Sequence, residues 1–504
     1  MQNLLLGFSE VFNPVTILWI ALGEVLGIIL GALPGLTATM GIALMLPISF
    51  QLSTPTGMGL LLGVYCGAVS GASIPAILLG IPGNPNAIAT VYDGHAMTKK
   101  GLAGQALGGA VVASFIGGIC SLMLLMLFSP LIARVTLAFG PAEKASLALL
   151  GLTIIASVST KNLAKGILTG LLGLALSLFG TDPFTNSLRI PFPSLLARTP
   201  LTSGIKLIPA LIGLFGISQA LYDLEKIKMG YAAPPQLKIE KIFPPIKKII
   251  RMWRIIVESV GIGSIIGAIP GTGASIAVFL SYERAKRITS SRKSKLDRVG
   301  TGCLEGVIAP EVANNSVTGG ALIPALSLGI PGDSSTAVLL GALLVKGVVP
   351  GYQLFTQDIS LVYSIFFALF LANFFMFSFQ LAGVRIFPKV LNIPLTILIP
   401  VILILSLIGS YAIEGQAVLA ATFDMGVALF LGILGYFLKK ADYPIAPIVL
   451  GLILGGMLEE NFRRAVKIAN GNYLVFFTKP IATVFIVLSI ISVVVSLLKS
   501  GKEK

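Results

Sequence analysis

The chain has 504 residues, of which 55% are hydrophobic and 11% charged, and its mean hydropathy is +0.94. These values exclude an ordinary soluble domain and indicate a helical membrane protein, because apolar stretches long enough to span a bilayer recur along the chain. The net charge of +15 does not require a nucleic-acid partner, since cytoplasmic loops of membrane proteins carry excess lysine and arginine.

An apolar region over about residues 15–50 opens the chain and is interrupted by Pro34-Gly35. Proline costs a helix interior about 3 kcal/mol and glycine about 1 kcal/mol, so the pair predicts that the helix stops there. Inside a membrane, the backbone groups that such a break leaves unpaired need partners in the protein or in a water-lined cavity. The break therefore indicates a binding site, unless it lies in a loop outside the membrane.

The next apolar region, about residues 60–79, ends in Gly80-Ile-Pro-Gly83 and leads into a polar segment over residues 84–100. We expect this segment at the membrane surface, with His95 in a loop; a role for this histidine in a proton relay is the less favoured alternative. Further spans are predicted at about residues 103–133, 145–160, 163–180 and 204–223.

The stretch over residues 223–254 contains two Pro-Pro pairs and a surplus of lysine and arginine, which suits a cytoplasmic linker. Residues 255–280 follow, interrupted by Pro270-Gly271 and flanked by basic loops. If both loops are cytoplasmic, the segment forms a re-entrant hairpin; a simple span with one basic loop outside is the alternative. Apolar runs in the rest of the chain bring the total to roughly 11–13 spans, at about residues 303–345, 359–382, 392–411, 416–437, 445–457 and 480–498.

Two motifs recur in the same order in both halves of the chain. Pro34-Gly35 corresponds to Pro270-Gly271 at an offset of 270 − 34 = 236, and the Ile-Pro-Gly triplet ending at Gly83 corresponds to that ending at Gly332, at 332 − 83 = 249. The recurrence predicts an all-α polytopic membrane protein with two structural repeats, expected to be inverted, each with re-entrant or broken helices. The repeats would comprise residues 1–223 and 255–504, with residues 224–254 as the cytoplasmic basic linker.

The residues expected to bind substrate lie at these breaks and just beyond them. Helix N-termini attract carboxylates through oriented N–H groups, and neutral hydroxyl and amide groups bind oxygen without the cost of burying a cation. The alternative for each residue is a structural role, as a helix cap or as a link between helices. In the first half the candidates are Pro34, Gly35, Thr37, Thr39, Gly83, Asn84, Asn86 and Thr90, and in the second half Gly271, Thr272, Gly273, Ser275, Gly332, Asp333, Ser334, Ser335 and Thr336.

A carboxylate and two amides, Glu311, Asn314 and Asn315, lie in an apolar, small-residue stretch. Such groups are expensive inside a membrane unless they have partners, so we expect them to bind the coupling ion, with Na⁺ as one option; locking helices together is the alternative. Glu24, Glu258 and Glu305 are weaker candidates, because acidic residues near span ends also lie at the membrane interface.

No enzyme is indicated. The chain has one histidine, which leaves no Ser-His-Asp set and no HExxH motif, and no Gly-Lys-Ser/Thr follows the Gly-rich stretch at 267–273, so ATP is not the driver. Cys66, Cys120 and Cys303 are scattered and are expected to be small buried hydrophobic residues. We predict no catalytic residues and no metal centre, apart from the Na⁺ option.

These spaced motifs resemble the large membrane subunit of the tripartite tricarboxylate transporter family (TctA type), in order through nearly the whole chain. At Asn84-Pro-Asn86 the chain departs from the family, in which we expect smaller residues after the first Ile-Pro-Gly. This departure leaves the identity of the substrate open. The resemblance rests on Gly31-Ala-Leu-Pro-Gly-Leu36, Ile77-Leu-Leu-Gly-Ile-Pro-Gly83, Asp93-Gly94 followed by Lys100-Gly101, Gly267-Ala-Ile-Pro-Gly-Thr-Gly273, Ala309-Pro-Glu-Val-Ala-Asn-Asn315 and Leu328-Gly-Ile-Pro-Gly332.

The resemblance implies a multi-pass protein of the bacterial cytoplasmic (inner) membrane that takes up di- or tricarboxylates by symport with Na⁺ or H⁺, without another cofactor. It implies two partners, a small TctB-like membrane subunit and a TctC-like extracytoplasmic solute-binding protein, and an elevator-like movement. A homodimer is compatible with the sequence. The alternative function is an ion or solute channel in which the Gly-rich breaks form a filter.

Overall fold

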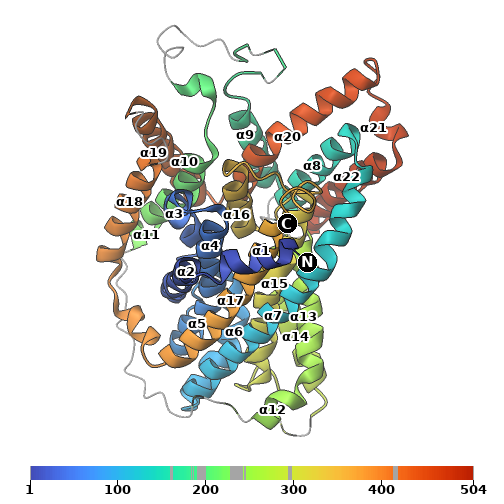
Figure 1. Cartoon of the computed structure of the whole chain (residues 1–504). Helices are drawn as coiled ribbons and strands as arrows, with labels where there is room; N and C mark the ends of the chain where they lie inside the picture. Colours follow the sequence, from blue (N-terminus) through green and yellow to red (C-terminus); the bar gives the residue numbers. More distant parts are fainter. Residues whose placement is uncertain are drawn as a thin grey trace. The chain divides into compact units, whose positions relative to one another are not determined.

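The computed structural model describes residues 2–158, 163–182, 184–185, 187–189, 200–226, 242, 244, 246–292, 294, 298–412 and 418–502. In these ranges the chain is helical, apart from turns, loops and one isolated antiparallel bridge between Thr181 and Leu188 (Figure 1). The predicted all-α class is therefore confirmed. The helices form two compact units: Met1–Leu131, Lys226–Ile269 and Gly273–Leu398 make the first, and Ile132–Glu225, Pro270–Thr272 and Ile399–Lys504 the second.

The first unit carries the helices next to the predicted breaks. They are α1 (Gln2–Val11), α2 (Pro14–Ala32), α3 (Ala38–Gln51), α4 (Thr54–Gly71), α5 (Ser73–Leu79), η1 (Pro85–Ala87), α6 (Ile88–Lys99), most of α7 (Ala103–Val135), α12 (Ile246–Arg251), α13 (Trp253–Ala268), α14 (Gly273–Thr289), α15 (Glu305–Leu328), α16 (Ser334–Val345), α17 (Ile359–Gly383) and η8 (Phe387–Asn392).

Each proline-glycine pair ends a helix where the sequence predicts it. The helix α2 ends at Ala32 and is followed by Leu33 in an extended conformation (φ −86°, ψ 117°); α13 ends at Ala268, followed by Ile269 at φ −84° and ψ 115°. The glycine of each pair has a positive φ, +96° at Gly35 and +78° at Gly271, a conformation that residues with a Cβ adopt rarely. The two breaks therefore share one backbone geometry.

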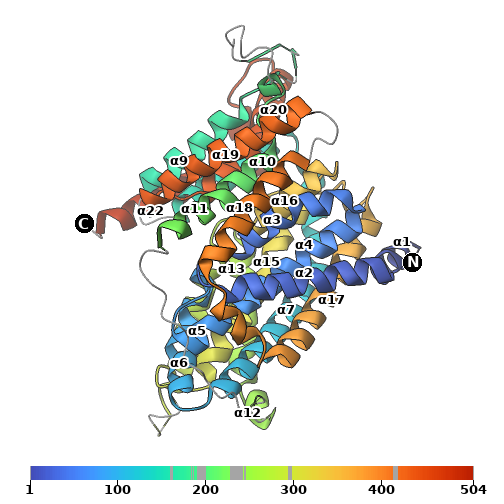
Figure 2. The same ribbon diagram turned by 90° about the vertical axis from the view of Figure 1, so that its left-hand side faces the viewer.

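The helices α2 and α4 lie side by side and approach closely through glycine (Figure 2). A Cβ atom at Gly31 would lie 2.3 Å from the carbonyl oxygen of Ala68, and one at Gly27 would lie 2.5 Å from that of Val64. Small residues at such positions let helix backbones come together in a membrane. These two contacts fix the register of α2 against α4.

The helices α13 and α15 approach each other in the same register. A Cβ atom at Gly263 would lie 2.4 Å from the carbonyl oxygen of Ala313, and this pair corresponds to Gly27 and Val64 at the offsets 263 − 27 = 236 and 313 − 64 = 249. A Cβ atom at Gly83 would lie 2.6 Å from the oxygen of Gly31, and its counterpart at Gly332 would lie 2.3 Å from that of Gly267. The close approaches therefore follow the sequence offsets.

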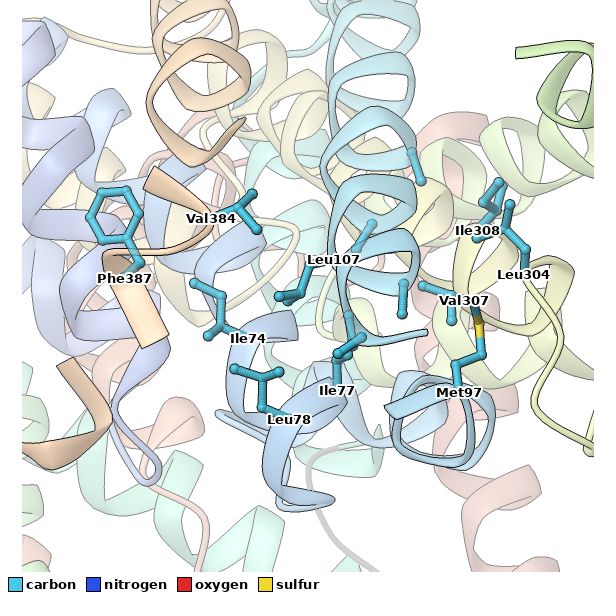
Figure 3. Close-up of a cluster of buried hydrophobic side chains, with 14 of the residues drawn as sticks. Ile74, Ile77, Leu78, Met97, Leu107, Leu304, Val307, Ile308, Val384 and Phe387 are labelled. Atoms are coloured by element: carbon cyan, nitrogen blue, oxygen red, sulfur yellow. The ribbon is translucent and has the colours of Figure 1, made fainter. Parts of the chain in front are cut away.

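A buried apolar cluster joins α5, α6, α7 and the beginning of α15 (Figure 3). Ile77, Met97, Leu107 and Val307 are each at most 3% exposed. From the polar segment 84–100, Met97 contributes to this cluster, whereas Ala87 with Val91 and Ala89 pack in two other apolar clusters. The expectation that His95 lies in a loop is wrong, because the residue lies within α6.

The second unit contains helices from the middle and the end of the chain. They are the end of α7, η2 (Thr136–Ala138), α8 (Pro141–Val158), α9 (Leu163–Ser177), η4 (Pro200–Ser203), α10 (Leu207–Leu211), the π-helix η5 (Ile212–Ile217), α11 (Ser218–Lys226), most of α18 (Leu395–Ala412), α19 (Val418–Lys440), α20 (Ala446–Ile468), α21 (Val475–Thr478) and α22 (Pro480–Lys502).

Ion pairs tie the loop after α9 to α20 in this unit. Arg463 contacts the carboxylates of Asp182 and Glu459, and Arg189 lies 2.7 Å from Glu459. Hydrogen bonding to the Arg463 guanidinium lowers the pKa of the Asp182 carboxyl to about 2. Because this pKa lies below the ordinary value of about 3.9, the stabilising effect is present above about pH 4 and lost as the pH falls through about 2. This network therefore does not titrate near neutral pH.

Six helical segments of the described ranges are long and apolar enough to cross a membrane. This supports a multi-pass membrane protein, while the total of 11–13 spans stays a prediction. The 16 residues of α13 and the 17 of α14 give each helix a length of about 25 Å, and the two pack against each other as a hairpin. Whether the hairpin is re-entrant stays a prediction, and most of the predicted linker, at 227–241, 243 and 245, lies outside the described residues.

We predict that Gly63→Ala destabilises the fold, because a Cβ atom there would lie 2.5 Å from the carbonyl oxygen of Ile20 and 2.9 Å from the backbone nitrogen of Glu24. Overpacking of this kind costs about 1–3 kcal/mol. The matched control is Gly261→Ala, also inside a helix, where a Cβ atom meets nothing within 4 Å. The midpoint of thermal unfolding in detergent should fall for the first variant and hold or rise for the second; equal midpoints would contradict the register described for α2 and α4.

Candidate functional site

The first break lies directly against the first Ile-Pro-Gly turn. The backbone N–H of Gly35 donates a hydrogen bond to the carbonyl oxygen of Gly83 at 3.1 Å. Thr37 caps α3, since its hydroxyl accepts from the backbone N–H of Met40 at 3.3 Å. The break thus finds partners for its backbone groups within the protein, as a break inside a membrane requires.

Just past this break, Thr39 reaches the second Ile-Pro-Gly turn. Its Oγ1 lies 2.9 Å from Oγ of Ser334 and 2.9 Å from Oγ of Ser335. Thr39 is in the first turn of α3, and the two serines begin α16. The N-terminal ends of two helices that are almost 300 residues apart in the chain are therefore joined by hydroxyl groups.

The converse contact links the first Ile-Pro-Gly turn to the helix that follows the second break. Oδ1 of Asn84 accepts from the backbone N–H of Asn86 at 3.0 Å, which fixes the turn. The hydroxyl of Ser275, in the first turn of α14, donates to Oδ1 of Asn86 at 2.8 Å. The Asn84-Pro-Asn86 sequence is thereby built into the contact between the halves.

These two contacts correspond to each other through the offsets of the sequence. Thr39 corresponds to Ser275, since 39 + 236 = 275, and Asn86 corresponds to Ser335, since 86 + 249 = 335. In each contact, a hydroxyl group just after one break bonds to a polar side chain just after the opposite Ile-Pro-Gly turn. The pair is reciprocal, which is the pattern of a two-fold arrangement. We define these four residues as the reciprocal contact.

Asp333 and Thr336 cap the N-terminus of α16. Oδ1 of Asp333 accepts from the backbone N–H of Thr336 at 2.7 Å and from its hydroxyl at 2.8 Å, and Tyr65 donates to Oδ2 at 3.3 Å. This is a capping box, an arrangement that satisfies the free N–H groups of a helix start. Its effect is to orient Ser334 and Ser335. The sequence did not predict Tyr65 as a site residue, because an aromatic residue within an apolar run does not indicate a polar contact.

The Glu311 group forms a second polar cluster in the first unit. The carboxylate is fully buried and accepts from Thr90 at 2.6 Å and from Ser114 at 3.4 Å. Asn315 donates to Ser114 Oγ at 2.8 Å, and Asn314 donates to the carbonyl oxygen of Val69 at 3.3 Å. Oδ1 of Asn314 is buried without a hydrogen-bond partner. The sequence predicted Glu311, Asn314, Asn315 and Thr90 as candidate site residues, but not Ser114.

The other predicted residues are glycines and neighbours of the breaks. Pro34 and Gly35 lie between α2 and α3, and Gly83 and Gly332 pack against α2 and α13 as described above. Gly271 and Thr272 form the turn between α13 and α14, in the segment that groups with the second unit. Gly273 begins α14 at φ +67° with space around its Cα.

A buried aspartate that sequence reasoning left out joins α6 to the loop before α15. Asp93 accepts from the backbone N–H groups of Gly300, Gly302 and Cys303 at 2.7–3.1 Å and from the hydroxyl of Tyr282 at 2.8 Å. The two glycines have φ of +100° and +82°, so the loop turns its N–H groups onto one carboxylate. The sequence signals were the Asp93-Gly94 motif of the family resemblance and the pair of glycines flanking Thr301, neither of which indicated that the two segments meet.

The chain is similar to one protein family and to two proteins of Agrobacterium vitis. Residues 17–450 match the family described as "Tripartite tricarboxylate transporter TctA family". An uncharacterized 52.8 kDa protein in the TAR-I ttuC' 3'region of Agrobacterium vitis is 34% identical over 507 residues, which span 100% of this chain and 97% of that protein. An uncharacterized protein in the TAR-II ttuC' 3'region of the same organism is 35% identical over 242 residues, 48% of this chain and 96% of that protein. No solved structure matches.

We predict that Asp93→Asn destabilises the protein, because an amide NH₂ cannot accept from the loop N–H groups that now meet the carboxylate. Hydrogen bonds to charged groups contribute about 1.5–3 kcal/mol each. The matched control is Asp442→Asn, at an exposed turn residue with φ +57°, where asparagine is well tolerated. Thermal unfolding in detergent should shift downward for the first variant alone, and no difference between the variants would remove the stabilising role assigned to the Asp93 contacts.

Proposed function

Because this chain belongs to the tripartite tricarboxylate transporter TctA family, we propose that it is the large membrane subunit of a secondary transporter that imports di- or tricarboxylates by ion symport. Because this is a family of transporter subunits, we propose transport rather than an enzymatic reaction. The substrate class, the coupling and the delivery of substrate by an extracytoplasmic binding protein are parts of the proposal.

The observation that carries the proposal is the reciprocal contact. Thr39 with Ser335 and Ser275 with Asn86 gather hydroxyl and amide groups from both breaks and both Ile-Pro-Gly turns. Neutral hydrogen-bond donors of this kind suit a carboxylate. The first turns of α3, α14 and α16 contribute to the same contacts, and helix N-termini favour anions. Substrate carboxylates would take the place of the hydrogen bonds that the four side chains now make with each other.

The matching close approaches of α2 with α4 and of α13 with α15 support two structural repeats related by a two-fold axis. Broken helices at such an axis are the usual binding place in repeat-built transporters. In this proposal, an elevator-like movement carries the site across the membrane, and the division into residues 1–223 and 255–504 describes the two repeats.

Na⁺ or H⁺ would drive the transport, with Glu311, Asn314 and Asn315 as ion-coupling residues. Their cluster offers carboxylate, hydroxyl and amide oxygens, which are ligands that suit a hard cation. Asp333 would act through its cap, by holding Ser334 and Ser335 in place. The partners proposed are a small TctB-like membrane subunit and a TctC-like binding protein, in the bacterial inner membrane, with a homodimer as the assembly to test.

We predict that Thr39→Val and Ser275→Ala each lower carboxylate uptake at least about tenfold, which corresponds to about 1.4 kcal/mol. Each removes a hydroxyl from the reciprocal contact, and an unsatisfied polar group costs about 1–3 kcal/mol. The measurement is uptake of labelled citrate, tartrate and related acids into proteoliposomes that contain the large and small membrane subunits, with the binding protein added, under imposed Na⁺ or H⁺ gradients.

The controls are Thr153→Val and Ser378→Ala, whose hydroxyls bond to carbonyl oxygens of their own helices. Both should transport like the wild type. Normal uptake in Thr39→Val and Ser275→Ala would remove the reciprocal contact from the site, and ion conductance in the wild type without saturable, gradient-dependent uptake would favour a channel.

A further inference from the structure

Glu24 is a fully buried carboxyl group that makes no hydrogen bond with any of the described residues. It lies in the middle of α2, its side chain is 0% exposed, and neither Oε1 nor Oε2 has a partner in the ranges given above. Glu311 is equally buried but accepts from two hydroxyls, and Glu258 and Glu305 pair with arginines. An ionised carboxylate without donors is very costly inside a protein, so this environment favours the neutral acid.

In the part of the chain that the structure describes, no group donates a hydrogen bond to the carboxyl of Glu24. Oε1 would lie 2.9 Å from a Cβ atom at Gly67 of α4, so the side chain lies against that helix. The titratable residues on the elements packed against α2 are Glu10 of α1, Tyr65 and Cys66 of α4, Tyr363 of α17 and Lys389 of η8. Of these, Cys66 interacts electrostatically with Glu24, and its thiol accepts from Asn373 of α17 at 3.9 Å.

The corresponding position in the second half indicates that packing does not need the carboxyl. Glu24 corresponds to Val260, since 24 + 236 = 260, and its neighbour Gly67 corresponds to Ser316, since 67 + 249 = 316. The helices α13 and α15 nevertheless meet in the register of α2 and α4, as the Gly263 and Gly27 contacts demonstrate. A helix pair in this register therefore accommodates a valine at the corresponding position, so the close approach itself does not require the carboxyl. An unpartnered buried carboxyl costs stability, which is the pattern of a group with a functional role.

We propose that Glu24 is a proton-carrying carboxyl of this transporter, so that H⁺ is a coupled ion. In the buried state the group holds its proton as COOH; in a state that opens the contact between α2 and α4, it releases H⁺ to water and becomes the carboxylate. Na⁺ fits less well, because it requires several oxygen ligands, and Glu24 faces glycine and a thiol. The assignment of coupling rests on the proposed function, whereas the protonated buried acid does not.

The first experiment needs no substrate. Infrared spectra of the purified wild-type protein at pH 7 should contain the carbonyl stretch of a protonated carboxyl that is absent from Glu24→Gln and present in Glu311→Gln. The proposal is overturned if the wild-type spectrum minus the Glu24→Gln spectrum contains carboxylate bands instead of the carbonyl band. It is also overturned if addition of Na⁺ at constant pH converts the carbonyl band into carboxylate bands.

A second measurement separates a functional carboxyl from a structural one. Glu24→Val, which introduces the residue found at position 260, should leave the midpoint of thermal unfolding unchanged or raise it, because it removes an unpartnered polar group. A lower midpoint would assign Glu24 a structural role and overturn the proposal. This variant also serves if Glu24→Gln does not fold.

The third measurement tests coupling in proteoliposomes with the partner subunits, using citrate and tartrate as probes. A variant without the carboxyl should lose accumulation driven by an H⁺ gradient while it still exchanges labelled for unlabelled substrate. H⁺-driven accumulation equal to the wild type would overturn the coupling role. Absence of uptake by the wild type itself would count against the proposed function, and the infrared result would then decide the protonation of Glu24 alone.

Discussion

Backbone groups released by a broken helix must find partners inside the protein, because the membrane offers none. Each half of the chain breaks a helix at a proline-glycine pair, and the N–H of Gly35 is satisfied by the carbonyl of Gly83. That hydrogen bond brings a break and an Ile-Pro-Gly turn together. The polar side chains just after each break lie against the opposite turn, where Thr39 bonds to Ser335 and Ser275 bonds to Asn86.

Buried and part-buried acids of the first unit illustrate three ways of compensating a carboxyl group for lost contact with water. Asp93 is surrounded by backbone N–H groups of a glycine-rich loop, Asp333 caps a helix, and Glu311 accepts from two hydroxyls. Each arrangement replaces the hydrogen bonds that water makes to an exposed carboxylate. Glu24 has no such compensation. Asp93 and Asp333 hold elements together through their hydrogen bonds. Glu24 lies without such partners among the described residues, at a position where the second half has Val260, and this difference is the reason for the proton-carrying role that we propose for it.

The correspondence between halves extends to some features and not to others. Glycine contacts between helices, the positive φ of Gly35 and Gly271, and the reciprocal contact all follow the offsets of 236 and 249. The Glu311 cluster does not, because the position 249 residues earlier is Leu62. The polar residues therefore divide into contacts that both halves share and a cluster around Glu311 without a counterpart at the corresponding position of the first half.

The sequence by itself determined the helical membrane class, the two helix breaks, the recurrence of the motifs and all four residues of the reciprocal contact as candidates, because proline, glycine and apolar runs act locally on the backbone. It failed for His95 and left out Tyr65, Ser114 and Asp93. Met97 of the helix at residues 88–99 packs with residues of α5 and α15, and the backbone N–H groups that bind Asp93 lie more than 200 residues away. Only the tertiary structure decided which buried polar groups are partnered, because a hydrogen bond depends on distances between helices that no local pattern encodes.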